Sequence, residues 1–306
     1  VIIYGSRQAV PLVEKMSGRE DRFMICRAVS CDEDISVITE LIDEFDAVII
    51  CDVPSEKKND ILKICFDRSK RTYVTPKLSD IIIRGAEQIH LFDTPLLVCR
   101  NTGLSAEELI LKRMLDLAVS LVGFIVTLPI MLITALCIKL YDGGPVFYTQ
   151  ERLTKDGKVF KVYKFRSMRT DAESDGVARL AGENDDRITP VGKVIRKVRI
   201  DELPQILNVL KGDMSIVGPR PERPELAAEN EKIMPEFSYR LKVKAGLTGY
   251  AQVLGKYNTT PYDKLRLDLM YIEQYSFLLD LKLILMTIKI LFVPESTEGV
   301  KEDKLS

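Results

Sequence analysis

The sequence predicts an α/β fold in which a domain built on a parallel sheet precedes a long apolar helix and a mainly α-helical second domain. Three observations predict it. Strand-like and helix-like runs alternate through residues 1–100, residues 117–137 contain no charged side chain, and helix-start and helix-stop signals fill residues 189–212. A chain of 306 residues is long enough for two domains, at about 150 residues per domain.

The alternating runs of the first domain set its strand and helix order. We expect strands at 1–4, 23–29, 46–51 and 72–76, with helices at 9–16, 36–45 and 55–68 between them. This order predicts a Rossmann-like domain over residues 1–100. The first strand-to-helix turn, at residues 5–10, keeps only the first glycine of the dinucleotide pattern G-x-G-x-x-G. We therefore expect a structural or regulatory domain without ordinary dinucleotide binding, with a nucleotide or ligand sensor as the alternative.

Charge and histidine content narrow the chemistry of the chain. The 44 lysines and arginines balance 45 aspartates and glutamates, so no global positive field attracts nucleic acid, and we expect no nucleic-acid partner. His90 is the single histidine, which we interpret as structural, so an enzyme of this composition would depend on carboxylates, lysines, arginines or thiols. The six cysteines show no CxxC spacing and are expected to be reduced core residues of a cytosol-facing protein.

The charge-free stretch at 117–137 predicts a membrane helix. A run of about 20 apolar residues is long enough to cross a bilayer. Pro129 near its middle removes a backbone hydrogen bond, and both flanks are basic, although positive charge prefers the cytosolic face. We therefore expect residues 111–140, after a linker at 101–110, to form a re-entrant helix that enters, bends at Pro129 and returns. A simple span and a buried core helix are the alternatives.

A second apolar run lies near the C-terminus, at residues 277–293. Lys282 and Lys289 are seven residues apart and share one helical face, which suits a helix lying in the headgroup plane. A packed C-terminal helix is the alternative. The second domain would then cover residues 141–295, followed by a polar tail at 296–306.

Two predicted helices meet at an Asp-Glu pair. A Thr-Pro start at 189–190 opens the first helix, which breaks near Ile200. The second is expected to start with Asp201 as its N-cap and to end before Gly212. Asp201 would therefore lie at the positive end of a helix.

An aspartate in this setting is suited to phosphate chemistry. The helix dipole and the guanidinium groups of Arg196 and Arg199 should favour the ionised form of Asp201. An ionised aspartate is a nucleophile and a ligand for a hard cation, and Glu202 beside it could act as a base. Mg2+ shared with substrate phosphate oxygens would screen the attack of one anion on another. The alternative is an aspartate that simply caps a helix.

Basic residues on both sides of this pair suggest phosphate binding. Arg220 stands between two prolines, which fix its backbone and suit bidentate contacts with phosphate. In the alternating strand at 157–168, Lys158, Lys164 and Arg166 fall on one face. This face would hold a diphosphate, or else it is an ordinary solvated surface.

Seven short motifs and the proline-broken apolar helix occur in the order seen in one known family. The motifs are Lys112-Arg-Met-Leu-Asp116, Gly144-Pro-Val-Phe-Tyr-Thr-Gln150, Tyr163-Lys-Phe-Arg-Ser-Met168, Asp201-Glu-Leu-Pro-Gln205, Asn208-Val-Leu-Lys-Gly-Asp-Met-Ser215, Val217-Gly-Pro-Arg-Pro221 and Gly246-Leu-Thr-Gly-Tyr-Ala-Gln252. Over residues 110–295 the chain thus resembles the bacterial sugar transferases, the monotopic phosphoglycosyl transferases also called polyprenyl-phosphate hexose-1-phosphate transferases. Residues 1–100 resemble, less specifically, the Rossmann-like domain that larger members carry after a bundle of four membrane helices. We therefore expect a missing membrane segment upstream of Val1.

The resemblance implies a membrane enzyme with a defined reaction. It would transfer a sugar 1-phosphate from a UDP-sugar to undecaprenyl phosphate at the cytosolic face of the bacterial inner membrane, with release of UMP. This step starts the assembly of exopolysaccharide, capsule, O-antigen or glycoprotein glycans. Asp201 would bind Mg2+ and form a phosphosugar-aspartyl intermediate. Glu202 would assist the attack of the lipid phosphate as base, and Arg220 would bind phosphate.

The resemblance also implies further site residues and leaves alternatives. Lys164, Arg196 and Asp268 fall at positions that the family keeps around its active site. Leu128 before the proline and Lys244-Ala245 before the glycine motif depart from the family pattern, which often has serine and Arg-Pro there. Larger relatives suggest a homodimer. A catalytically silent, membrane-attached scaffold protein is the alternative function, and an NAD-dependent N-terminal enzyme is disfavoured by the depleted glycine turn.

Overall fold

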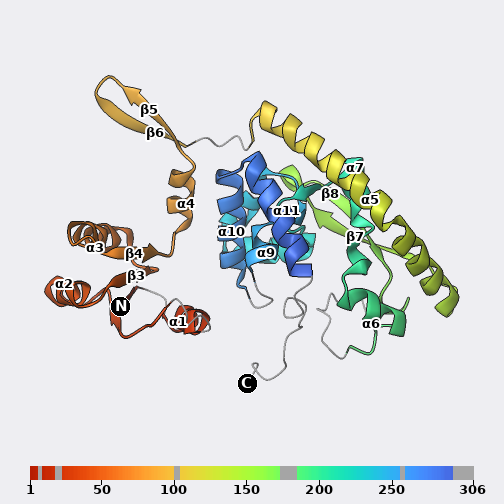
Figure 1. Ribbon diagram of the computed structural model, residues 1–306, viewed down its shortest axis with the longest axis horizontal. Helices are drawn as coiled ribbons and strands as arrows, with labels where there is room; N and C mark the ends of the chain where they lie inside the picture. The colour runs from red at the N-terminus through yellow and green to blue at the C-terminus, as the bar shows by residue number, and fades with distance from the viewer. Residues whose placement is uncertain (6–8, 18–22, 100–103, 173–184, 256–258, 292–306) are drawn as a thin grey trace. The chain divides into compact units, whose positions relative to one another are not determined.

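The computed structural model of the chain describes residues 1–5, 9–17, 23–99, 104–172, 185–255 and 259–291. The chain forms two compact units, Val1–Asp80 and Ile81–Ser306, whereas the sequence predicts the boundary at 101–110. The fold is mixed α/β: the first unit contains a parallel sheet, and the second contains one long apolar helix (Figure 1).

The first unit is a four-stranded parallel sheet with helices between its strands. Its elements are β1 (Ile2–Tyr4), α1 (Val10–Ser17), β2 (Ala28–Ser30), α2 (Ile35–Glu44), β3 (Ala47–Cys51), α3 (Ser55–Asp67) and β4 (Arg71–Val74). The strands lie in the order β2-β1-β3-β4. The helix α1 packs against Ile2 and Ile49, whereas α2 and α3 pack against Ile3 and Ile50. Because neighbouring strand residues point to opposite sides, helices cover both faces of the sheet.

Details of the first unit differ from the sequence prediction. The strand expected at 23–29 pairs only through Ala28–Ser30, because β1 offers just three residues for pairing. Gly5 has a packing reason, since a Cβ there would overlap the backbone carbonyl oxygen of Asp52. Residues 6–8 of the same turn lie outside the described residues. All six cysteines are free, as expected, but the prediction of core positions holds for half of them: Cys31, Cys51 and Cys65 are buried, and Cys26, Cys99 and Cys137 are exposed.

The second unit is mainly helical and holds three separate strand pairs. After α4 (Leu78–Arg84), its elements are β5 (Glu87–Leu91), β6 (Thr94–Val98), α5 (Ala106–Asp142), β7 (Phe147–Leu153), β8 (Val159–Phe165), α6 (Pro190–Lys197), α7 (Gln205–Lys211), β9 (Ser215–Val217), α8 (Pro224–Ile233), β10 (Gly246–Thr248), α9 (Tyr250–Leu254), α10 (Pro261–Glu273) and α11 (Phe277–Leu291). The pairs β5-β6 and β7-β8 are antiparallel, and β9-β10 is parallel. His90 lies on β5, in an exposed hairpin.

The helix α5 is the one described helix that is long and apolar enough to cross a membrane. It has 37 residues and begins at Ala106, within the predicted linker, because Ser105 and Glu108 form a capping box there. It remains one continuous helix through Pro129, so the predicted return at this residue is not formed (Figure 1). A proline removes one hydrogen bond of the helix, here the bond to the carbonyl of Ile125. In the preceding turn, the Thr127 hydroxyl donates to the carbonyl of Gly123.

The basic residues before the apolar stretch point into the protein. Lys112 Nζ donates to Asp280 Oδ2 at 2.7 Å and to the Tyr271 hydroxyl at 2.8 Å, and all three residues are buried. The Arg113 guanidinium donates to the carbonyls of Val209 and Leu210, in the last turn of α7. Lys112 and Arg113 therefore do not provide the free positive flank that the sequence predicts, because both are bonded within the second unit.

The helix α11 combines the two alternatives that the sequence leaves open. One face packs into the unit through Asp280 and Leu283, which are fully buried. The opposite face exposes Leu278 and Leu285, and Lys282 is exposed on this side as well. The helix is therefore amphipathic, with a packed face and a face that combines apolar and basic side chains.

Candidate active site

The Asp-Glu pair lies on a tight turn between α6 and α7. Arg199 adopts a left-handed conformation, with φ 56° and ψ 22°, and Ile200–Glu202 form a 3-10 turn after it. The helix α7 starts after Pro204, which makes no side-chain capping bond. The prediction that Asp201 is an N-cap is therefore wrong, because the left-handed residue and the proline move the cap position from Asp201 to Pro204.

Glu202 is held by two cations. Lys164 Nζ and Arg220 Nη2 both donate to Glu202 Oε1, at 2.7 Å and 3.1 Å. Burial alone would raise the pKa of Glu202, but the charges of Arg220 and Lys164 hold it well below its ordinary value. Glu202 is therefore firmly ionised, and one of its oxygens lies between the two cations.

Asp201 has a different electrostatic setting from its neighbour. Burial and the negative charge of Glu202 raise the pKa of Asp201 to about 6, and Lys164 and Arg196 offset part of this effect. The expectation that the surroundings favour ionisation is wrong in sign, because burial outweighs the arginines. At neutral pH the carboxylate is still ionised, but it is more basic than an exposed aspartate. Lys164 and Arg220 bind Glu202 and leave the oxygens of Asp201 to other partners.

A pocket beside Glu202 is lined by three cationic side chains, Arg152, Lys164 and Arg220. Arg152 and Lys164 reach it from one face of the β7-β8 pair, because the register sets Arg152 opposite Phe160 and Lys164 opposite Tyr148. The lining of this pocket thus has three cations and one carboxylate, which suits an anionic ligand, although Arg152 also lies 3.9 Å from Glu222 outside the lining. The sequence prediction does not include Arg152, although its alternation along β7 relative to the basic strand could have indicated it.

Arg166 lies apart from this pocket. Its Nη1 donates to Asp142 Oδ2 at 2.6 Å, its Nη2 donates to the other carboxylate oxygen, and its Nε donates to the carbonyl of Pro145. The hydrogen bonds from Arg166 lower the pKa of Asp142 to about 2. The structure therefore uses Arg166 to fix the end of α5. Strand β8 ends at Phe165, so the alternation that groups Arg166 with Lys164 does not extend to it.

The structure places Arg196 and Asp268 differently from each other. Arg196, in the last turn of α6, is close enough to Asp201 for its charge to lower the pKa of that carboxyl. Asp268 is buried in α10 and forms an ion pair with Arg240 at 2.8 Å. Its link to the pocket is indirect, since Arg240 also donates to the carbonyl of Arg220.

The carboxylate pair can hold a divalent cation in one particular way. Among the residues that the structure describes, no group of three His, Cys, Asp or Glu side chains could hold a metal ion. Mg2+ commonly binds through one or two carboxylates together with substrate phosphates and water. Asp201, ionised and beside a second carboxylate, fits this mode of binding.

Paired carboxylates, three cationic side chains and a long apolar helix in one unit suit a protein that handles phosphates at a membrane surface. The bacterial sugar transferase family matches residues 107–294, more than half of the chain, and the chain belongs to this family. The resemblance seen in the sequence motifs is thereby confirmed.

Curated relatives support the same family. The chain is 37% identical over 258 residues to an undecaprenyl-phosphate glucose phosphotransferase of Komagataeibacter xylinus, covering 81% of this chain and 48% of the relative. It is 43% identical over 182 residues to UDP-N-acetylgalactosamine-undecaprenyl-phosphate N-acetylgalactosaminephosphotransferase of Aeromonas hydrophila, covering 58% and 43%. The exopolysaccharide production protein PSS of Rhizobium leguminosarum bv. phaseoli is 41% identical over 201 residues, covering 63% of this chain and 98% of the relative. The chain spans about half the length of the first two relatives.

Proposed function

We propose that this protein transfers a sugar 1-phosphate from a UDP-sugar to undecaprenyl phosphate, with release of UMP, as a first step of polysaccharide assembly. The activities for which the relatives are named support this class of donor and acceptor. The observation that carries the proposal is that the two neighbouring carboxylates differ in their ion pairs and in their pKa values. Glu202 is bound by Lys164 and Arg220, whereas Asp201 beside it has a raised pKa and no ion pair with either cation.

In the first step, Asp201 acts as the nucleophile. A carboxylate oxygen of Asp201 bonds to the sugar-proximal phosphorus of the UDP-sugar, and the bond from this phosphorus to the bridging oxygen breaks. The bridging oxygen keeps the electron pair and leaves with UMP, so the sugar phosphate remains on Asp201. The raised pKa of Asp201 makes its oxygen a better nucleophile, and Lys164 and Arg220 bind the phosphate charge.

In the second step, an oxygen of undecaprenyl phosphate bonds to the same phosphorus, and the bond to Asp201 breaks. This restores the Asp201 carboxylate and leaves the sugar on a lipid diphosphate. Glu202 accepts any proton carried by the attacking phosphate. It can do so only in the loaded site, because its low pKa depends on Lys164 and Arg220. Substrate phosphates that engage these cations raise the basicity of Glu202.

Asp201 would hold Mg2+ together with substrate phosphate oxygens. The ion would supply neutralising charge between the carboxylate and the phosphates. The surplus of cations in the pocket supports a ligand with several negative charges. This assignment is tested by binding of Mg2+ to the protein in the presence of UMP, with Asp201→Asn as the variant expected to weaken it.

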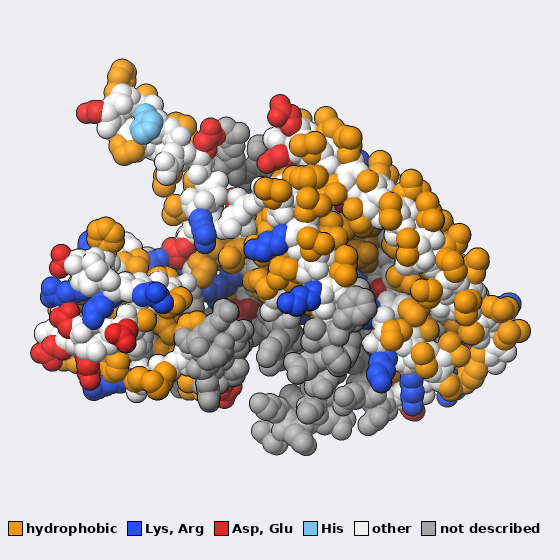
Figure 2. All heavy atoms as spheres, viewed as in Figure 1, with side chains coloured by type: hydrophobic (Ala, Val, Ile, Leu, Met, Phe, Trp, Pro, Cys, Tyr) orange, Lys and Arg blue, Asp and Glu red, His pale blue; other side chains and the backbone are white. Residues whose placement is uncertain are grey.

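We further propose that α5, which does not turn back at Pro129, lies along the cytosolic leaflet of the inner membrane with both ends at the cytosolic face and does not span the membrane. Support comes from how its two ends are attached. Lys112 near its start bonds Asp280, and Asp142 at its end bonds Arg166, all within the same compact unit. Its other face exposes a continuous apolar surface along the helix (Figure 2). A helix fixed at both ends to one polar unit cannot place its ends on opposite sides of a membrane without burying charge.

The activity is tested by incubating the full protein with Mg2+, undecaprenyl phosphate and a panel of UDP-sugars, and measuring UMP. We expect UMP with at least one sugar, at a rate that depends on the lipid phosphate. Absence of UMP with every common UDP-sugar rejects the proposal and favours a silent scaffold protein. The topology is tested with single cysteines at Glu107 and Tyr141. Both should react with an impermeant maleimide from the cytosolic side, and labelling from opposite sides rejects the non-spanning arrangement.

A further inference from the structure

The loop that carries Arg220 is held by its backbone. Four successive carbonyl oxygens, from Pro219 to Glu222, each accept a hydrogen bond from a different residue, and the donors lie on three separate segments of the chain. The donors are Gly246 N to Pro219 O at 2.8 Å, Arg240 Nη2 to Arg220 O at 3.0 Å, Arg152 Nη1 to Pro221 O at 3.3 Å and Leu153 N to Glu222 O at 2.9 Å. Because Arg220 also stands between two prolines, little freedom remains for its main chain. The guanidinium of Arg220 is thus presented from a fixed backbone.

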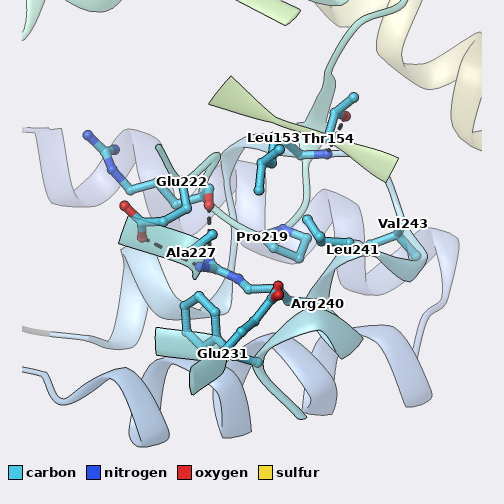
Figure 3. A pocket seen from close by; sticks show the side chains of 12 residues that line it. Leu153, Thr154, Pro219, Glu222, Ala227, Glu231, Arg240, Leu241 and Val243 are labelled. Carbon is cyan, nitrogen blue, oxygen red and sulfur yellow. Dashed lines mark hydrogen bonds and ion pairs between the residues drawn. The ribbon is translucent and has the colours of Figure 1, made fainter. Parts of the chain in front are cut away.

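Arg240 donates to the carbonyl of Arg220, whose side chain lines the pocket. Its side chain is only 4% exposed. Its Nη2 lies 2.8 Å from Asp268 Oδ2 as well as 3.0 Å from the Arg220 carbonyl, and its Nη1 lies 3.5 Å from Glu222 Oε2. Figure 3 shows Arg240 reaching across to Glu222 beneath the loop. Arg240 therefore connects two carboxylates to the backbone of Arg220.

Phe237 completes the enclosure of this guanidinium. Its ring lies 4.9 Å from the Arg240 Cζ and is itself 2% exposed. A planar guanidinium between an aromatic ring and two carboxylates can take one orientation only. Lysine keeps the charge at this position but has one nitrogen, which cannot lie close to Asp268, Glu222 and a carbonyl in the way that the two terminal nitrogens of Arg240 do.

Stability alone does not account for this buried pair. A buried Arg-carboxylate pair is often no more stabilising than well-packed apolar residues, because both charges lose their water. Burial indeed raises the pKa of Asp268 to about 6 although Arg240 is in contact with it. Burying the Arg240–Asp268 pair costs free energy, and Arg240 also bonds the backbone of Arg220. The pair is therefore better explained by the position in which it holds Arg220.

We infer that Arg240, backed by the buried Asp268, is a positioning residue that fixes the main chain of Arg220 and thereby directs its guanidinium to Glu202 and the substrate phosphate. The inference rests on the proposed function. It also gives Asp268 a role different from substrate contact: Asp268 acts through Arg240 and Arg220.

The inference is tested with a double-mutant cycle in the full protein. We expect Arg240→Lys to lower kcat/KM for the UDP-sugar by about 10- to 100-fold, since small misplacements of a binding group have effects of this size. In an Arg220→Ala background the same change should have almost no further effect, because the group that it positions is gone. Affinity for UMP, measured without the lipid, should fall equally in Arg240→Lys and Arg220→Ala.

Two further variants keep the test decisive. Asp268→Asn should reproduce the same non-additive pattern with less disturbance of packing, and it serves where Arg240→Lys does not fold. Arg266→Lys is the matched control, because Arg266 pairs with Asp263 on α10 and makes no bond to the loop. An equal loss from Arg240→Lys in both backgrounds, or unchanged affinity for UMP, overturns the inference. Absence of UMP release by the wild type instead overturns the proposed function.

Discussion

Two lysine-carboxylate ion pairs of the second unit have the same N–O distance but differ in exposure and in the charges around them. Lys164 lies 2.7 Å from Glu202, and Lys112 lies 2.7 Å from Asp280. The Glu202 pair borders a pocket, with side chains 22% and 19% exposed, and Arg220 shares the carboxylate. The Asp280 pair is 6% and 1% exposed, and its remaining partner is the neutral hydroxyl of Tyr271.

The difference lies in the charge balance of the two clusters. The Asp280 cluster pairs one cation with one carboxylate and is almost fully buried, so it joins α5 to α10 and α11. Arg152 lines the pocket together with the two cations that bind Glu202, and Asp201, next to Glu202 in the sequence, forms no ion pair with either of these two cations. Short distance therefore does not identify a functional ion pair. An excess of one charge and access to solvent are the features that indicate a functional ion pair.

The largest effect is expected from removing the carboxylate that lies outside the ion pairs. Asp201→Asn keeps the shape but removes the nucleophile, so UMP release should fall by about 1,000-fold or more. The measurement is UMP release with a saturating UDP-sugar. Asp263→Asn, at a surface carboxylate of α10, is the control and should retain activity. Substantial activity of Asp201→Asn contradicts its role as nucleophile.

The comparison of the two lysine pairs gives the second prediction. Lys112→Met leaves the Asp280 carboxylate buried without its cation, and the free energy of unfolding should fall by about 3–5 kcal/mol. Glu202→Gln should lower stability by less than Lys112→Met does, because the cations that it leaves behind border the pocket and can be hydrated, but it should lower kcat by about 100-fold. Thermal unfolding in detergent and UMP release measure the two effects. Adding Asp280→Leu to Lys112→Met should restore most of the stability. If Glu202→Gln destabilises the protein as much as Lys112→Met, the distinction between the clusters is wrong.

The third prediction concerns pH. Because Asp201 must be ionised to attack and its pKa is raised to about 6, kcat/KM should fall about tenfold per pH unit below pH 6. Glu202 raises this pKa, and Arg196 lowers it, so Arg196→Gln should move the acid limb to higher pH. Asp268 has a pKa of about 6 as well. Asp268→Asn should nevertheless keep the limb in place, and a displaced limb in this variant would show that Asp268 is the titrating group.

Much of the fold and part of the site follow from the sequence. Alternating runs indicate the parallel sheet, because each strand and helix buries apolar side chains at its own period. The charge-free stretch indicates α5 by its length and its lack of charge alone. The structure brings together Glu202, Lys164 and Arg220, which the motifs single out, and their roles in the reaction stay predictions.

The remaining features depend on tertiary context. The turn at Asp201 requires a left-handed Arg199, a conformation that arginine does not signal. The sign of the pKa shift of Asp201 depends on burial, which outweighs the nearby cations only in the folded chain. The role of Arg240 depends on residues far apart in sequence, since Asp268, Glu222 and Arg220 meet at its guanidinium.

The smallest expected effect tests the neighbour of the buried lysine. Arg113 donates at 2.7 Å and 2.9 Å to the last carbonyls of α7, the helix that begins just after the Asp-Glu pair. Arg113→Met leaves these carbonyls without their charged donor, so the free energy of unfolding should fall by about 1–2 kcal/mol. Lys211→Met is the matched control, because Lys211 lies in the same last turn but its side chain is 64% exposed. The predicted order is Lys112→Met, then Arg113→Met, then Lys211→Met, since a hydrogen bond to a carbonyl leaves no buried charge behind when it is lost. Equal effects of Arg113→Met and Lys211→Met would show that the bond between α5 and α7 contributes nothing to holding the helix that follows the site.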